Sequence, residues 1–348
     1  MTALAPPTTA HGAVAEVRLH TRRRSLLATA AATGGLLAAF AIAMLVGDYA
    51  LEPWAVVRAL FGDGSRIDVF VVNQVRLPRA AMAVLCGLAL GIAGALFQTL
   101  LRNPLASPDL LGVSGGASVA AVWTTLILGL SGAAVAASAF VGGMLVAAVL
   151  LLAARRLADG GYRLVLAGVG IAFLCSAVIG YLIKRAQVTQ AQSALVWITG
   201  SIGATPWTDV VVVAAVLLLV APAVWAATRL LPIVELGDPL ASGLGVRPVA
   251  VRIGVVVVAV LLAAASTAFI GPVGFVALCA PPIARALLGR GASGIAVSGV
   301  FGAVILLVSD LIAQYAIPGV AVPVGVVTGL VGAPYLLWLL ATSKGHRW

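Results

Sequence analysis

The sequence predicts an all-α, polytopic membrane protein of about ten transmembrane helices. Of its 348 residues, 62% are hydrophobic and only 9% are charged, whereas a soluble domain carries about 25% charged residues. A soluble fold would need a larger core than a chain of this length can build. The uncharged runs are instead long enough to cross a bilayer as helices, which takes about 20 residues.

The charge balance agrees with a membrane location. The chain has 21 Lys and Arg residues against 11 Asp and Glu residues. In a soluble protein this excess would suggest nucleic acid as a partner, but here the positive-inside rule explains it. Most of the basic residues fall on the cytoplasmic side if both ends of the chain are cytoplasmic, and we predict that orientation.

The first segments read as a tail, a span and a loop. Residues 1–25 are polar and basic and are expected to form a cytoplasmic tail. The apolar run Leu26–Val46 is longer than the apolar core of a signal peptide, so we predict a retained first span. Residues 47–75 are amphipathic and predict an external loop with a short surface helix.

The stretch that follows organises the rest of the chain. We expect a helix over about Arg76–Leu101, in which residues 80–101 are uncharged. Gly87, Gly91 and Gly94 share one face of this helix, and small residues at such spacing let neighbouring helices approach closely. The pattern therefore predicts a helix in the interior of a bundle.

Glycine-rich breaks divide the two longest uncharged stretches. The stretch between Asp109 and Arg155 divides at Gly129–Gly132, and residues 253–284 divide at Gly271–Gly274. Residues 187–201 are uncharged but too polar for lipid, which favours a short surface or half-inserted helix on the outside. The other spans are expected at residues 164–183, 210–228, 291–309 and 323–342, and residues 343–348 form a basic cytoplasmic tail.

The longest internal connection, residues 229–252, contains signals for a short helix. Asp238 and Pro239 suit an N-cap and a first helical turn. Gly243 and Gly245 suit a stop. A helix of about two turns over residues 239–244 is too short to span a membrane. It is either a contact for a partner or a solvated loop helix.

The chain lacks the side chains that most transport and catalytic chemistry requires. Asp310 is the one ionisable residue expected inside a span, whereas ion-coupled transporters need such groups to carry the coupling ion. No GxxxxGK[ST] loop is present, so ATP hydrolysis must reside in another protein. We therefore expect a transport subunit rather than an enzyme, without cofactor or metal. The histidines lie in the tails and the cysteines lack metal-site spacing: His11, His20, His346, Cys86, Cys175 and Cys279.

Several short motifs occur in a fixed order over about residues 70–342. They are Arg76-Leu77-Pro78-Arg79, Arg102-Asn103-Pro104-Leu105-Ala106 with Leu111-Gly112-Val113-Ser114, Leu166-Ala167-Gly168-Val169, Trp197-Ile198-Thr199-Gly200-Ser201, Gly237-Asp238 to Leu244-Gly245-Val246, Gly271-Pro272-Val273-Gly274-Phe275, and Pro323-Val324-Gly325-Val326-Val327-Thr328 with Gly332-Ala333-Pro334. The ordered set resembles the FecCD-type permease family, the membrane subunits of ABC importers for iron–siderophores, haem and vitamin B12.

The resemblance implies a type II ABC importer permease fold, with residues 26–342 as one transmembrane domain in the cytoplasmic membrane. It implies a second permease copy or paralogue, an ABC ATPase dimer on the inside and an extracytoplasmic substrate-binding protein on the outside. Arg76 and Arg79 match external arginines that dock the binding protein; the alternative is anchoring to lipid headgroups. The coupling segment for the ATPase, within residues 229–252, comprises Asp238, Pro239, Leu240, Ala241, Ser242, Gly243, Leu244 and Gly245.

Two positions depart from the family pattern. Many members carry an arginine four residues after the aspartate of the ninth span, where this chain has Gln314 after Asp310. The resemblance therefore implies that a third docking charge is missing. Pro282 stands where the family often has histidine, so no role is carried over to that residue.

The predicted function is the translocation of an iron–siderophore complex. Vitamin B12 and haem are alternative substrates within the same family. A stand-alone secondary transporter is the alternative from another class, and the scarcity of charge in the spans argues against it. A structural membrane subunit without a transport path is a third alternative.

Overall fold

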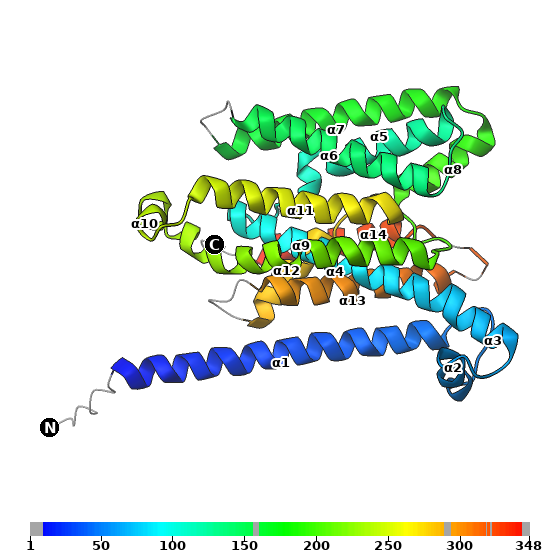
Figure 1. The fold of residues 1–348 in the computed structure, drawn as a ribbon, viewed down its shortest axis with the longest axis horizontal. Helices are drawn as coiled ribbons and strands as arrows, with labels where there is room; N and C mark the ends of the chain where they lie inside the picture. Colours follow the sequence, from blue (N-terminus) through cyan, green and yellow to red (C-terminus); the bar gives the residue numbers. More distant parts are fainter. Residues whose placement is uncertain (1–9, 156–159, 289–293, 318, 321, 343–348) are drawn as a thin grey trace.

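The computed structural model shows a bundle of long helices that run roughly alongside one another (Figure 1). It describes all residues except 1–9, 156–159, 289–293, 318, 321 and 343–348. The helices are α1 (Ala10–Leu45), α2 (Pro53–Leu60), α3 (Arg66–Phe70), α4 (Leu77–Leu101), α5 (Val113–Leu126), α6 (Ala133–Arg155), α7 (Gly160–Arg185), α8 (Val188–Thr199), α9 (Trp207–Glu235), α10 (Asp238–Gly243), α11 (Pro248–Ile270), α12 (Val276–Leu288), α13 (Ile295–Tyr315) and α14 (Val324–Thr342).

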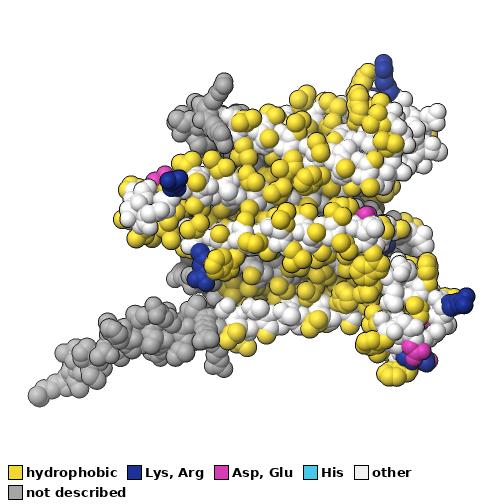
Figure 2. All heavy atoms as spheres, in the orientation of Figure 1, with side chains coloured by type: hydrophobic (Ala, Val, Ile, Leu, Met, Phe, Trp, Pro, Cys, Tyr) yellow, Lys and Arg dark blue, Asp and Glu magenta, His cyan; other side chains and the backbone are white. Residues whose placement is uncertain are grey.

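The all-α membrane architecture is confirmed. Within the described residues, 7 helices are long and apolar enough to cross a membrane, and α5, α12 and α14 are shorter apolar helices. Together they correspond to the ten predicted spans. Figure 2 shows a hydrophobic band across this face of the molecule, with Lys, Arg, Asp and Glu side chains gathered toward its two ends. This distribution is the one a bilayer imposes, because charged groups are costly in hydrocarbon.

We name the two ends of the bundle by the short helices that lie there. The α2–α3 end carries the last turn of α1, the start of α4, helix α8 and the last turn of α13, and the α10 end lies opposite (Figure 1).

Most of the breaks between spans fall where glycine predicts them. Gly129 and Gly132 separate α5 from α6, and Gly271 follows α11, all with positive φ angles.

Some helices extend past their predicted limits. α1 begins at Ala10, so the described part of the predicted tail is helical. Helical structure also begins at Arg66, ahead of the predicted start at Arg76, and continues through a π-helical segment, residues 71–76, into α4. The start is set by Ser65, whose side chain accepts a hydrogen bond from the Asp68 amide at 3.1 Å.

Helix α4 lies in the interior of the bundle. Of its apolar stretch 72% is buried, as in α11, against 17% in α1 and α7, which lie at the periphery. The glycine face of α4 explains how neighbours approach it. Gly87 and Gly91 lie against the backbone of α13 and Gly94 against that of α12, so closely that a Cβ atom at any of them would collide with backbone atoms.

The break after α11 is tied to the end of α8. Ser201 donates its amide to the carbonyl of Ile270 at 2.8 Å, and Gly325 donates to the carbonyl of Gly200 at 3.1 Å. The residues that follow α8 thus satisfy the last carbonyl of α11 and an amide in the first turn of α14. Backbone groups at breaks between spans need such partners within the protein where lipid offers none.

The close packing of α4 predicts that replacing glycine by alanine changes the stability differently at two positions. Gly91→Ala should lower the stability of the purified protein by about 1–3 kcal/mol, because the added methyl group overpacks the contact with α13. Gly34→Ala in α1, where a Cβ meets nothing within 4 Å, should be neutral or stabilise by up to about 1 kcal/mol. Thermal unfolding in detergent micelles measures both, and equal effects would contradict the close packing of α4.

Candidate functional sites at the two ends of the bundle

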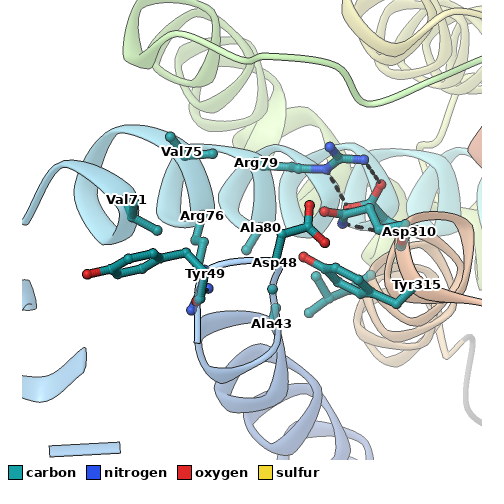
Figure 3. A pocket seen from close by; sticks show the side chains of 13 residues that line it. Ala43, Asp48, Tyr49, Val71, Val75, Arg76, Arg79, Ala80, Asp310 and Tyr315 are labelled. Carbon is teal, nitrogen blue, oxygen red and sulfur yellow. Dashed lines mark hydrogen bonds and ion pairs between the residues drawn. The ribbon is translucent and has the colours of Figure 1, made fainter. Parts of the chain in front are cut away.

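A polar pocket of about 330 Å³ opens at the α2–α3 end, between the last turn of α1, the start of α4 and the end of α13 (Figure 3). Its polar and charged lining residues are Asp48, Tyr49, Arg76, Arg79, Asp310, Gln314 and Tyr315. Both arginines of the predicted docking pair therefore line one pocket, although their guanidinium groups have different partners.

Arg76 fastens α1 to α4. Its side chain is buried, and its guanidinium donates to the carbonyls of Met44 at 2.6 Å, Leu45 at 3.4 Å and Tyr49 at 2.5 Å. The last carbonyls of a helix have no partner inside the helix. A cation placed there satisfies them and favours the negative end of the helix dipole. Arg76 therefore caps α1.

Arg79 forms a bidentate ion pair with Asp310. Its Nε lies 3.0 Å from Oδ2 and its Nη2 lies 2.9 Å from Oδ1. Gln314, one turn further along α13, donates to Oδ2 at 2.7 Å. The Asp310 residue is only 2% exposed. The pair neutralises the one acid within α13 and links the first turn of α4 to the last turns of α13.

The ion pair was not foreseen from the sequence, which left Asp310 without a partner. A buried carboxylate needs a compensating cation, and this requirement was the available signal. Arg76 and Arg79 were among the basic residues predicted at the same end as Asp310. Gln314 occupies the position of a family arginine, and in this chain it completes the hydrogen bonding of Asp310 instead of presenting a charge.

The two arginines point in different directions, Arg76 toward α1 and Arg79 toward α13 (Figure 3). They do not form one exposed patch. The Arg79 side chain is 26% exposed, and its Nη1 makes no hydrogen bond within the described residues. Nearby, the Tyr49 hydroxyl donates to Asp68 at 3.2 Å, and this hydrogen bond raises the pKa of Tyr49.

At the opposite end, α10 differs from its prediction at its start and at one of its two predicted stops. The prediction that Asp238 is the N-cap is wrong: Gly237, with φ of 101°, holds that position and Asp238 is the first helical residue. The Asp238 carboxylate instead pairs with Arg252 at the start of α11, at 2.5 and 3.1 Å. Because glycine adopts positive φ freely, it can turn the chain into the helix without a side-chain cap.

The end of α10 is a Schellman motif. Gly245 has φ of 81°, its amide donates to Ser242 at 3.0 Å, and the Val246 amide donates to Ala241 at 3.0 Å. Gly245 is therefore the stop. Gly243 is not, because it is the last helical residue and has no positive φ.

The surface of α10 is apolar and uncovered. Ala241 is fully buried beneath the helix, whereas Leu240 is 62% and Leu244 is 65% exposed. Leu236 before the helix and Val249 after it are exposed to a similar degree. The helix protrudes from the bundle (Figure 1). The other residues of the predicted coupling segment are also exposed: Asp238, Pro239, Ser242, Gly243 and Gly245.

Comparisons with known proteins agree with the family resemblance and the fold. The model of the FecCD transport family matches residues 35–342. The chain is 37% identical over 321 residues to YfmE, an Fe(3+)-citrate import system permease protein of Bacillus subtilis, covering 92% of this chain and 96% of that protein. It is 37% identical over 301 residues to FepG, a ferric enterobactin transport system permease protein of Escherichia coli, covering 86% and 91%.

The fold is also found among solved structures. A chain described as a metal-chelate type ABC transporter in an inward-facing conformation superposes with a TM-score of 0.79 and 24% identity, covering 91% of this chain and 99% of that one. This similarity concerns the arrangement of the helices.

The Arg79–Asp310 pair generates a double-mutant prediction. Arg79→Gln or Asp310→Asn alone should destabilise the protein by about 3–5 kcal/mol, because each leaves one charge with no counter-ion, Asp310 in a buried site. The double variant should lose much less than the sum of the two. The control cycle is Arg252→Gln with Asp238→Asn, an exposed pair worth about 0–1 kcal/mol. Thermal unfolding measures both cycles, and additive losses at Arg79 and Asp310 would contradict the pairing.

Proposed function

The chain belongs to the FecCD transport family of ABC transporter permeases, and on that premise we propose that it carries a ferric siderophore inward across the cytoplasmic membrane. Relatives named for ferric citrate and ferric enterobactin support an iron chelate as the cargo. A separate ATPase supplies the energy. A substrate-binding protein delivers the cargo from outside the cell.

The pairing of the buried acid in α13 is the observation that carries this proposal. The described membrane-spanning helices contain one buried acid well inside a helix, and Arg79 already neutralises it. A transporter driven by protons or sodium needs a group that binds the coupling ion and releases it again. A carboxylate held in a bidentate ion pair would have to give up that pair to bind a coupling ion, which is costly in a buried site. The driving force must therefore enter from outside the chain.

The α10 end offers the surface for that entry. Leu240 and Leu244 expose apolar side chains on a helix whose ends are fixed by Gly237 and Gly245. A short capped helix with uncovered leucines supports contact with a cleft on an ATPase better than a solvated loop, because exposed apolar surface gains free energy when a partner covers it. We propose on this basis that the α10 end faces the cytoplasm, in agreement with the predicted cytoplasmic tails and the positive-inside rule.

Docking of the binding protein is proposed at the α2–α3 end. Asp310 occupies the edge of the Arg79 guanidinium formed by Nε and Nη2, so Nη1 is left for an incoming carboxylate. Asp310 stays paired while that carboxylate binds, which avoids the cost of an unpaired buried charge. Arg76 contributes by holding α1 and α4 in position, because its own donors are occupied by carbonyls.

A second permease copy or a paralogue is proposed as a further partner. The peripheral helix α7 exposes Phe173 and Leu174, and α14 exposes Leu330 and Leu337. These helices support an interface in the membrane plane beside which the cargo passes.

Substituting the leucines of α10 tests the contact with the ATPase. Leu240→Asp with Leu244→Asp should reduce uptake of radiolabelled ferric citrate or ferric enterobactin by about tenfold or more, as expected for apolar anchors of an interface. The assay uses cells that lack the native chain, with haem and vitamin B12 as competing cargoes. Leu240→Met with Leu244→Met should retain uptake. Full uptake by the Asp variant at normal membrane abundance would refute the contact.

The docking site is tested with the stability-matched double variant Arg79→Gln with Asp310→Asn. Its affinity for the binding protein, measured by surface plasmon resonance on the permease–ATPase complex in nanodiscs, should fall about tenfold, the equivalent of about 1.4 kcal/mol. The dependence of affinity on salt should also weaken. An unchanged Kd would show that Arg79 serves only to join α4 to α13.

A further inference from the structure

We propose that Arg102 is a positioning residue, which connects the interior helix α4 to the base of α10 and so transmits movement of α10 into the bundle. The inference rests on the proposed function, in which the ATPase grips α10. It starts from a backbone observation. Arg102 ends α4 with φ of 49° and ψ of 37°, and only Phe275 shares a positive φ among the described residues other than glycine.

A left-handed conformation crowds the Cβ atom of any residue except glycine. Glycine would end α4 with less strain, as Gly245 ends α10. An arginine at this position therefore needs a reason that lies in its side chain, since strained backbone of this kind is retained where the surroundings require it.

The side chain reaches the end of a different helix. The Arg102 Nη2 donates to the carbonyl of Glu235 at 2.5 Å, and Glu235 is the last residue of α9. Only Leu236 and Gly237 separate that carbonyl from α10. A cation at the carbonyl end of a helix satisfies a free acceptor and favours the helix dipole. The guanidinium thus joins the end of α4 to the segment from which α10 starts.

A second contact holds α10 from the other side. Arg252 of α11 forms a bidentate pair with Asp238, the first residue of α10. Between the two arginines lies a pocket of about 220 Å³, lined by Arg102, Glu235, Gly237 and Arg252 together with Thr99 and apolar residues of α4 and α9. Side chains of α4 pack on α9 up to Leu231, and the Arg102 hydrogen bond extends this connection past the packed region to the last residue of α9.

The position of α4 determines what the Arg102 contact can do. α4 is locked to α13 along its glycine face and joined to it again by Arg79 and Asp310 at the far end. A displacement of α10 that reaches α4 therefore reaches the interior of the bundle. Without Arg102, α10 stays attached to α9 through the backbone and to α11 through Arg252, so the ATPase should still bind while its movement is transmitted poorly.

The test uses Arg102→Gly, which permits the left-handed turn and removes the whole side chain, the guanidinium included. The complex with the ATPase and the binding protein is reconstituted in liposomes, and ATP hydrolysed per ferric citrate or ferric enterobactin imported is measured. The ratio should rise about tenfold, the effect of losing one hydrogen bond to a charged group. Assembly with the ATPase should be unchanged. Arg102→Lys should restore most of the coupling.

Arg229→Gln is the matched control at the same end. It removes an equal charge, but the Arg229 guanidinium lies over the Trp225 ring at 5.3 Å instead of bridging two helices. Its ratio should stay at the wild-type value. A wild-type ratio in Arg102→Gly would overturn the proposal. So would failure of both Arg102→Gly and Arg102→Asn to assemble while Arg102→Lys assembles, because Arg102 would then be required for folding. Absence of ATP-dependent uptake by the wild-type complex would instead refute the proposed function itself.

Discussion

The structure depends on one physical constraint: hydrocarbon offers no hydrogen bonds and does not stabilise isolated charges. Most of the described contacts follow from it, although Arg285 Nε and Asn73 Oδ1 are buried without a hydrogen bond within the described residues. The spans are helical, so their backbone groups are satisfied internally. The break after α11 is hydrogen-bonded to the residues that follow α8. The carbonyls at the end of α1 are capped by Arg76, and the acid within α13 is neutralised by Arg79 and Gln314. Arg76 and Arg79, which were predicted to face a partner, therefore also satisfy carbonyls and an acid inside the protein.

The same constraint explains why α4 is central. Lipid is as apolar as leucine, so burial in the membrane gives helices little reason to associate, and close backbone packing takes the place of the hydrophobic effect. The glycines of α4 provide that packing against α12 and α13. Polar contacts at the two ends of α4 then connect it to other helices, through Arg79 to α13 and through Arg102 to α9. One helix thus spans the distance between the proposed docking pocket and the proposed ATPase contact.

The parts of this arrangement that were predictable are those encoded locally. Gly129, Gly132 and Gly271 mark breaks because positive φ angles suit glycine, and the glycine spacing of α4 marks its buried face. The ion pair was not predictable, because Arg79 and Asp310 are 231 residues apart and their pairing follows from the packing of α4 on α13. Arg102 and Glu235 are likewise 133 residues apart. At α10 both Gly237 and Asp238 suit the N-cap position. Gly237 occupies it, and the Asp238 carboxylate pairs with Arg252.

The proposed function makes one central claim, that this chain moves its cargo only with energy supplied by a partner. The direct test reconstitutes the purified chain in liposomes, alone and with its ATPase and binding protein, and follows radiolabelled ferric citrate and ferric enterobactin. Concentration of a ferric complex should require all three components and ATP, and a proton or sodium gradient imposed on the chain alone should drive none. Accumulation by the chain alone in response to either gradient would contradict the account.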